Sequence, residues 1–267
     1  MIRFYEETHQ YVTEHGEIYE SVSSLISKYK QPFDEKGTAL TVSRKKTSKW
    51  YNMQPEEIIA VWQKEKNRAC ELGKHYHSIR EKALLGCNTI NHGTGYNLQI
   101  VKPEIREGVK YALPQVLLDG IYPEHLMYLD GAKKAGQADY VEVYDGFINI
   151  SDYKTNKEIK TEGFKMWNGK SKKMLGPLRH LDDINFNHYS LQLSAYMFMI
   201  MKHNPQLIPG KMIIEHVMFE EEKHKDKYGY PITIFGMDGP IIKDVVKYEV
   251  PYLKFEINQL MYGNKTV

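Results

Sequence analysis

Two apolar runs joined by Asp145-Gly146 constrain the fold of this chain more than any other segment. An Asp-Gly pair between alternating apolar runs predicts a β-hairpin with a two-residue turn, because a type I′ turn needs positive φ at both central residues. Such a turn fixes the register of the two strands. We therefore expect Asp139 to lie opposite Asp152, five pairs beyond the pair formed by Tyr144 and Phe147.

The same register places Asp139 and Asp152 on one face of the hairpin. Side chains alternate between faces along a strand, so this face also carries Val141, Val143, Ile148, Ile150 and Lys154. The face is otherwise aliphatic, and we expect it to be buried. Carboxylates with Cβ atoms roughly 5 Å apart repel each other, and burial without a partner increases the cost. A divalent cation would offset this cost; a solvated pair neutralised by Lys154 alone is the alternative.

Composition is that of an ordinary globular protein of 267 residues, 42% hydrophobic, which suits one large domain. The two cysteines, Cys70 and Cys87, are too few for a disulfide framework or a four-cysteine iron–sulfur cluster. The longest apolar run is far too short to span a bilayer, and the first residues show no secretory signal. We therefore expect a cytoplasmic protein without membrane contact.

Charge is concentrated in one segment, although the whole chain carries only +2. Between Lys154 and His180 there are eight basic and two acidic residues, a net charge of +6, with Phe164 and Trp167 interleaved. A basic segment with aromatic residues favours a polyanion that has stackable bases. An ordinary solvated loop is the alternative.

Hydrophobic periodicity and turn residues predict an α/β (α+β) fold with a central mixed β-sheet flanked by helices. The expected helices are a short one capped by Ser21 or Ser23, then 55–85 with a break left open, 103–119, 186–201 and 251–261. The expected strands are a hairpin in 2–20, then 123–129, the central hairpin, 211–220 and 229–235. Residues 34–52 are expected to form a polar connection.

Two of these helices carry polar residues one turn apart. Gly73 and His77 share a face, and a glycine inside a helix suggests close approach by another backbone. His77 could then point into a site or be an ordinary satisfied histidine. Gln192 and Tyr196 also share a face, and the Gln192 amide needs a partner among apolar neighbours. That partner is a backbone group, or a catalytic lysine and a DNA phosphate.

Four motifs in this order resemble those of the PD-(D/E)XK nuclease superfamily, in its RecB-like branch. They are Gly73…His77, Gly136-x-x-Asp139, Asp152-Tyr153-Lys154 and Gln192-x-x-x-Tyr196. The segment Tyr19-x-Ser21-Val22-Ser23 is similar to an N-terminal element of phage-type nucleases and mitochondrial genome-maintenance exonucleases. The segment 176–192 is likewise similar to phage members. The resemblance covers about residues 19–200.

The resemblance implies a restriction-endonuclease-like core in a single domain, 1–267, with an N-terminal hairpin and helix element (1–52) and a basic insertion (155–185). It implies Mg²⁺ or Mn²⁺ bound by His77, Asp139, Asp152 and the main-chain carbonyl of Tyr153, with Glu124 as a further candidate acid. It assigns Asp139, Asp152 and Lys154 to catalysis, with Lys154 orienting and activating the attacking water. An iron–sulfur cluster is not expected. At the position of Asp152 the family more commonly has Glu, whose side chain is longer by one methylene group.

The function expected from this resemblance is that of a metal-dependent DNA nuclease, an exonuclease acting on single-stranded or duplex DNA ends. Replication or recombination proteins are candidate partners. The alternatives are a structure-specific endonuclease for flaps or branches, a sequence-specific restriction enzyme, and a non-catalytic DNA-binding subunit on the same fold. The candidate DNA-binding residues are Ser21, Lys157, Trp167, Lys172, Lys173, Gln192 and Tyr196.

Overall fold

The computed structural model describes residues 1–93, 95–163, 169 and 171–263. Its α-helices are α1 (Val22–Ser27), α2 (Glu35–Arg44), α3 (Pro55–Leu85), α4 (Asn185–His203) and α5 (Lys254–Tyr262), with short 3₁₀ helices at Asp130–Ala132 and Gly176–Leu178. Its first strands are β1 (Ile2–Tyr5), β2 (Gln10–Thr13), β3 (Ile18–Ser21), β4 (Thr89–Asn91), β5 (Asn97–Gln99), β6 (Glu104–Arg106), β7 (Val109–Tyr111) and β8 (Gly120–Leu129). They are followed by β9 (Lys134–Tyr144), β10 (Phe147–Lys154), β11 (Ile208–Phe219), β12 (Glu221–Lys225), β13 (Pro231–Thr233), β14 (Phe235–Gly236), β15 (Gly239–Pro240) and β16 (Ile242–Glu249).

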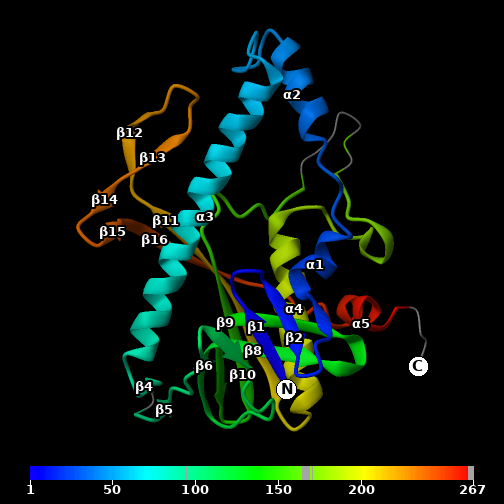
Figure 1. The fold of residues 1–267 in the computed structure, drawn as a ribbon, viewed down its shortest axis with the longest axis vertical. Coiled ribbons are helices and arrows are strands. Elements are labelled where there is room, and N and C mark those ends of the chain that lie inside the picture. The colour runs from blue at the N-terminus through cyan, green and yellow to red at the C-terminus, as the bar shows by residue number, and fades with distance from the viewer. Residues whose placement is uncertain (94, 164–168, 170, 264–267) are drawn as a thin grey trace.

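A large mixed sheet organises the molecule, with helices on its faces (Figure 1). Its strands run in the order β16-β11-β10-β9-β3-β2-β1-β7-β6, and β8 pairs with β9 as well. The strands β8, β9 and β10 form an antiparallel meander, and α4 then returns the chain so that β11 lies parallel to β10. The structure is therefore a mixed α/β fold with helices flanking a central sheet.

Strand β9 changes its neighbour on one edge. Strand β8 pairs with one edge along 134–143, with a gap at Asp139, while the other edge pairs with β10 along 140–144 and with β3 at 134–135. No strand of the described chain pairs with residues 136–139 on that second edge. The sheet therefore opens at this point, directly beside Asp139.

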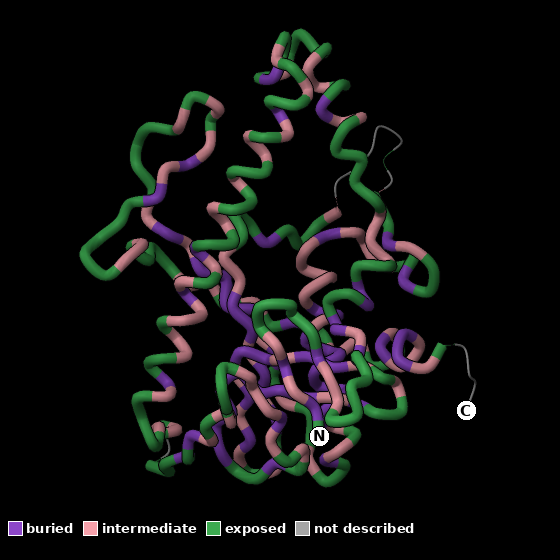
Figure 2. Tube along the Cα trace, in the orientation of Figure 1, coloured by how far each residue is buried: buried purple, intermediate pink, exposed green. Residues whose placement is uncertain are grey.

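The two sides of the sheet are covered by different helices. Helix α4 packs its apolar residues on Val141, Val143, Ile148 and Ile150, all fully buried in the main core. Helix α3 crosses the other face and buries Leu72 and Tyr76 against Tyr153, Val217 and Phe219. Figure 2 shows that buried residues concentrate where the sheet meets these helices, whereas the α2 end of α3 is largely exposed.

The register predicted for the central hairpin is confirmed. Tyr144 pairs with Phe147 and Val141 with Ile150, as a two-residue turn requires. Asp145 and Gly146 both have positive φ, +49° and +78°. The predicted helix 55–85 is also confirmed, without a break, and Ser21 caps α1 by accepting a hydrogen bond from the Ser24 N–H.

Four sequence-based expectations were wrong or incomplete. Residues 103–119 contain the β6–β7 hairpin instead of a helix, because Glu107 (φ +50°) and Gly108 (φ +76°) form a turn of the same kind as Asp145-Gly146. The polar connection 34–52 contains α2, capped by Asp34. The hairpin expected in 2–20 is present as β2 and β3, but β1 adds a third strand to it. The region expected as one strand at 229–235 holds β13 and the start of β14.

No helix among the described residues is long and apolar enough to cross a membrane.

Candidate active site

The candidate site lies where β9 and β10 part. Their ladder ends at the pair of Tyr140 and Ser151, so Asp139 and Asp152 are the next residues opposite each other. The Tyr153 N–H donates to Asp139 Oδ2 at 2.6 Å. A side-chain carboxylate thus takes the place of a main-chain acceptor, which fixes Asp139 at the opening of the sheet.

The regular alternation of side chains is interrupted at the same place. Ala138 and Val141 both belong to the main core, although strict alternation would put them on opposite faces. The β8–β9 pairing is interrupted between Pro123–Tyr140 and His125–Ala138, where Glu124 and Asp139 lie, and Glu124 has φ +50°, which is unusual for a residue other than glycine. The prediction that Asp139 simply continues the face of Val141 and Val143 therefore needs correction, since Asp139 turns toward α3.

Helix α3 brings a histidine to these carboxylates. His77 Nδ1 lies 3.2 Å from Asp139 Oδ1, and the His77 ring meets the Tyr153 ring edge-on at 5.5 Å between centroids. Gly73 lies against the end of β10, where a Cβ atom would be 3.1 Å from Thr155 Oγ1. The close neighbour of Gly73 is therefore a side chain, not the backbone that the sequence suggested.

Three potential metal ligands converge here. One nitrogen or oxygen each of His77, Glu124 and Asp139 lie within 4.8 Å of one another, and both carboxylates are buried. Asp152 is not part of this group. The geometry thus puts Glu124, a secondary candidate from the sequence, in the place expected for Asp152.

Burial and neighbouring charges shift the pKa values of Glu124, Asp152 and His77. Burial and the charge of Asp139 raise the pKa of Glu124 to about 7, against the opposing charge of Lys110. Burial likewise raises the pKa of Asp152 to about 6, with Lys154 pulling it down and Asp139 pushing it up. Burial alone would lower the pKa of His77, but its hydrogen bond to Asp139 and the surrounding carboxylates raise it to about 9. The site therefore has an excess of negative charge.

Two lysines partly compensate that charge. Lys154 pairs with Asp152 Oδ2, an oxygen that makes no well-aligned hydrogen bond within the described chain. Lys110, from β7, lies 3.6 Å from Glu124 Oε2, and the Gln137 amide donates to the same oxygen. Both ammonium groups are largely buried, with 16% and 14% of the side chains exposed.

The donor set fits a small divalent cation. Two buried carboxylates and an imidazole are ligands that Mn²⁺ accepts readily and that do not exclude Mg²⁺. Burial and the charge of Asp139 raise the pKa values of Glu124 and Asp152, which is the direction that a bound cation would oppose. An ion bound among His77, Glu124 and Asp139 would supply that positive charge.

The Gln192 and Tyr196 pair is internal to α4. The Gln192 amide donates to the Tyr196 hydroxyl at 2.8 Å, so its partner is neither the backbone group nor the lysine considered from the sequence. The Tyr196 ring is buried against Gly136, where a Cβ atom would be only 2.5 Å from Cε1. Tyr196 thus packs on the open edge of β9.

The remaining candidate DNA-binding residues are more dispersed. Lys172 lies 3.6 Å from Asp183 and Lys173 lies 2.7 Å from Asp182, while Lys157 is exposed. The Ser21 hydroxyl oxygen is engaged in capping α1. Trp167 lies outside the described residues.

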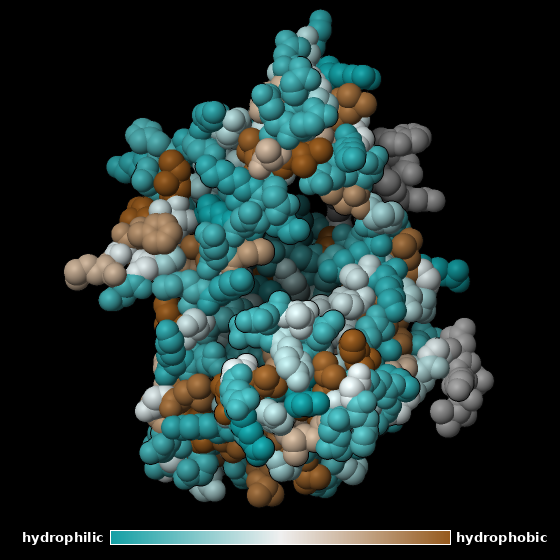
Figure 3. All heavy atoms as spheres, viewed as in Figure 1, coloured by the Kyte–Doolittle hydropathy of each residue, from teal (hydrophilic) through white to brown (hydrophobic). Residues whose placement is uncertain are grey.

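Figure 3 shows a hollow on the face between α3 on one side and α1 and α4 on the other, surrounded mainly by hydrophilic residues. The two helices that border this hollow, α3 and α4, are those that carry His77 and Gln192.

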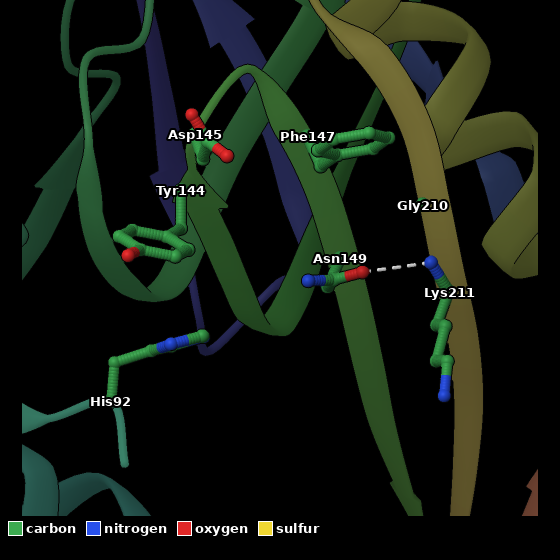
Figure 4. Close-up of a pocket in the computed structure, with 7 residues that line it drawn as sticks. All are labelled: His92, Tyr144, Asp145, Phe147, Asn149, Gly210 and Lys211. Atoms are coloured by element: carbon green, nitrogen blue, oxygen red, sulfur yellow. Dashed lines mark hydrogen bonds between the residues drawn. The ribbon is translucent and has the colours of Figure 1, made fainter. Parts of the chain in front are cut away.

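A separate cavity of about 570 Å³ lies at the turn end of β9 and β10 (Figure 4). It is lined by His92, Tyr144, Asp145, Phe147, Asn149, Gly210 and Lys211. Asn149 bridges the neighbouring strand through a hydrogen bond from the Lys211 N–H. None of its lining residues belongs to the candidate site, which lies at the other end of this hairpin.

Sequence reasoning missed two residues at the site. Tyr189 lies beneath the Lys154 ammonium, and its spacing of three and seven residues before Gln192 and Tyr196 could have placed it on the same helix face. Lys110 gave no such signal, because its strand was expected to be helical.

No model of a known protein family, no curated protein and no solved structure matches this chain.

Proposed function

We propose that this protein is a metal-dependent DNA nuclease with a restriction-endonuclease-like core, of the PD-(D/E)XK type that its motifs resemble. The observation that carries the proposal is that charged side chains from three separate elements come together at one place. His77, Asp139 and the Asp152–Lys154 pair come from α3, β9 and β10, yet their charges act on one another at one opening of the sheet. Gln192 and Tyr196 pack beside this opening.

In this proposal His77, Glu124 and Asp139 hold Mg²⁺ or Mn²⁺, and Asp152 lies beside them. When bound, such an ion polarises a phosphoryl oxygen, lowers the pKa of water and stabilises the leaving oxyanion. The Tyr153 N–H keeps the Asp139 carboxylate oriented, and the buried walls limit the access of bulk water.

Lys154 acts as a cation in this scheme. Burial lowers the pKa of its amine, but the charges of Asp152 and Asp139 outweigh burial and raise the pKa above its ordinary value. Lys154 therefore stays protonated at neutral pH. It can donate a hydrogen bond to water or to a phosphate oxygen and stabilise developing negative charge, but it does not take up a proton.

The exonuclease form of the proposal rests on the RecB-like resemblance, and DNA ends are the proposed substrate. The test is digestion of 5′- and 3′-labelled linear DNA and of covalently closed circles, with Mg²⁺, Mn²⁺ or EDTA. We expect metal-dependent loss of the linear DNA. Efficient cutting of closed circles would replace the exonuclease by an endonuclease.

Matched variants distinguish cleavage at this site from cleavage by a contaminating nuclease. Asp139→Asn should abolish cleavage, while Asp145→Asn, the same change at the exposed turn of the same hairpin, should retain it. In the same samples Mn²⁺ should raise the melting temperature of the wild type and of Asp145→Asn only. Equal activity of the two variants would refute the proposed site.

A further inference from the structure

The ammonium of Lys154 has an aromatic neighbour that the nuclease motifs do not include. Its Nζ lies 4.9 Å from the centroid of the Tyr189 ring, while Asp152 pairs with it as the acidic partner. A cation within about 6 Å of a ring is attracted by the negative face of the π-system. Lys154 is therefore held by one charged and one aromatic partner.

The Tyr189 ring is itself fixed in place. Its hydroxyl donates to Asn156 Oδ1 at 2.5 Å, and the main-chain oxygen of Asn156 is hydrogen-bonded to His216 Nε2 at 2.6 Å. Asn156 follows Lys154 by two residues, so Tyr189 ties the first turns of α4 to the end of β10. A ring with these restraints is a stable surface for a flexible side chain.

The Lys154 ammonium is carried on a flexible side chain, so it needs a fixed neighbour to keep it in one position. A cation bound among His77, Glu124 and Asp139 would repel the Lys154 ammonium and so offset part of its attraction to Asp152. The ring attraction does not depend on the charge of Asp152, because it arises from the ring quadrupole. It persists when the carboxylates are neutralised.

We propose that Tyr189 is a positioning residue whose ring holds the Lys154 ammonium at the carboxylates, and thereby at the substrate phosphate. This role rests on the nuclease function proposed above. Tyr189 contacts no reacting atom in this scheme and acts through Lys154 alone.

The experiment compares Tyr189→Leu, which removes the ring, with Tyr189→Phe, which keeps the ring and removes the hydroxyl. We expect Tyr189→Leu to lower kcat by about 3- to 30-fold with little change in KM for DNA, as the range of cation–π energies predicts. Tyr189→Phe should recover most of this loss. Tyr252→Leu, a half-buried tyrosine outside the site, is the matched control and should retain wild-type kcat.

A second measurement does not need activity. Modification of lysine amines by an N-hydroxysuccinimide ester, read by mass spectrometry, reports how well Lys154 is protected. We expect faster labelling of Lys154 in Tyr189→Leu than in the wild type, Tyr189→Phe or Tyr252→Leu. If the wild type cleaves no DNA, the nuclease proposal fails, while this measurement still decides whether Tyr189 holds Lys154.

Two results would overturn the inference. Equal loss of kcat and equal labelling in Tyr189→Phe and Tyr189→Leu would show that the hydroxyl bond to Asn156 matters and the ring does not. Wild-type labelling of Lys154 in Tyr189→Leu would show that the ring does not hold the ammonium. If Tyr189→Leu does not fold, Tyr189→Met replaces it as a bulky side chain without a ring.

Discussion

Replacing Glu124 by Gln should change how the stability of the metal-free protein depends on pH. Glu124 and Asp139 lie where the β8–β9 pairing is interrupted, and burial together with the charge of Asp139 raises the pKa of Glu124 from 4.5 to about 7. The folded state therefore binds a proton that the unfolded state releases at lower pH. The free energy of unfolding falls as pH rises through this window, because the carboxylate becomes charged among other carboxylates.

The magnitude follows from the two pKa values. At 1.36 kcal/mol for each pKa unit, the rise to about 7 is equivalent to about 3 kcal/mol in total. Between about pH 5 and pH 8 the linkage relation gives a loss of about 2.5 kcal/mol from this group. Glutamine cannot ionise. The free energy of unfolding of Glu124→Gln should therefore fall by about 2.5 kcal/mol less than that of the wild type between about pH 5 and pH 8. Solvent screens this carboxylate little, because Glu124 is only 8% exposed.

The assay is urea denaturation in EDTA at a series of pH values, for the wild type and Glu124→Gln. The difference between the two proteins cancels the contributions of groups that do not interact with Glu124; His77, whose pKa the charge of Glu124 raises, is not one of them. The contribution of His125 does cancel: burial lowers its pKa to about 4, and its contribution to stability is lost as pH falls from about 6.5. Parallel pH profiles of the two proteins would refute the claim that the carboxylates repel one another here.

Mn²⁺ provides the complementary test on the same samples. A metal at one hundred times its Kd stabilises a protein by about 2.7 kcal/mol, and it should remove much of the pH-dependent loss in the wild type. Glu124→Gln lacks one of the three converging ligands and should gain far less. Equal Mn²⁺ stabilisation of both proteins would exclude Glu124 as a ligand.

The other predictions concern packing, catalysis and DNA contact. Gly136→Ala should destabilise the fold by about 1–3 kcal/mol in urea denaturation, because its Cβ would be 2.5 Å from the Tyr196 ring. Gly131→Ala, where the Cβ would meet open space, is the control, and equal stabilities of the two variants would contradict this packing. Lys154→Ala should abolish cleavage but keep Mn²⁺ binding in calorimetry, because an ammonium is not a ligand; retained turnover would refute its role. Lys172→Ala should mainly weaken DNA binding and reduce the salt slope by about one, and an unchanged slope would exclude a phosphate contact.

Elements with strong local signals were predictable from the sequence. Asp145-Gly146 sets the β9–β10 register through its backbone conformation alone, so the pairing from Tyr144 and Phe147 to Tyr140 and Ser151 did not depend on distant contacts. The helix 55–85 was equally clear, because Pro55 and two acids begin it and an apolar stripe continues through it. The same turn rule applied to Glu107-Gly108 would have corrected the false helix at 103–119.

The composition of the candidate site was only partly predictable. His77 and Lys154 came from motifs that lie within single elements. Glu124 reaches the site because β8 pairs with the far edge of β9, and Lys110 reaches it because β7 belongs to the neighbouring part of the sheet. No spacing along the chain encodes either contact, since both depend on which strands become neighbours.

The amino-acid sequence by itself determined the central hairpin, the placement of Asp139 and Asp152 at its open end and the helices that carry His77 and Gln192, because turn conformation and hydrophobic periodicity act over a few residues. Only the tertiary structure decided that β9 is left unpaired at Asp139, that Glu124 joins His77 there, and that Lys154 lies between Asp152 and the Tyr189 ring. These features arise from strand order and helix packing, which bring together groups that are far apart along the chain.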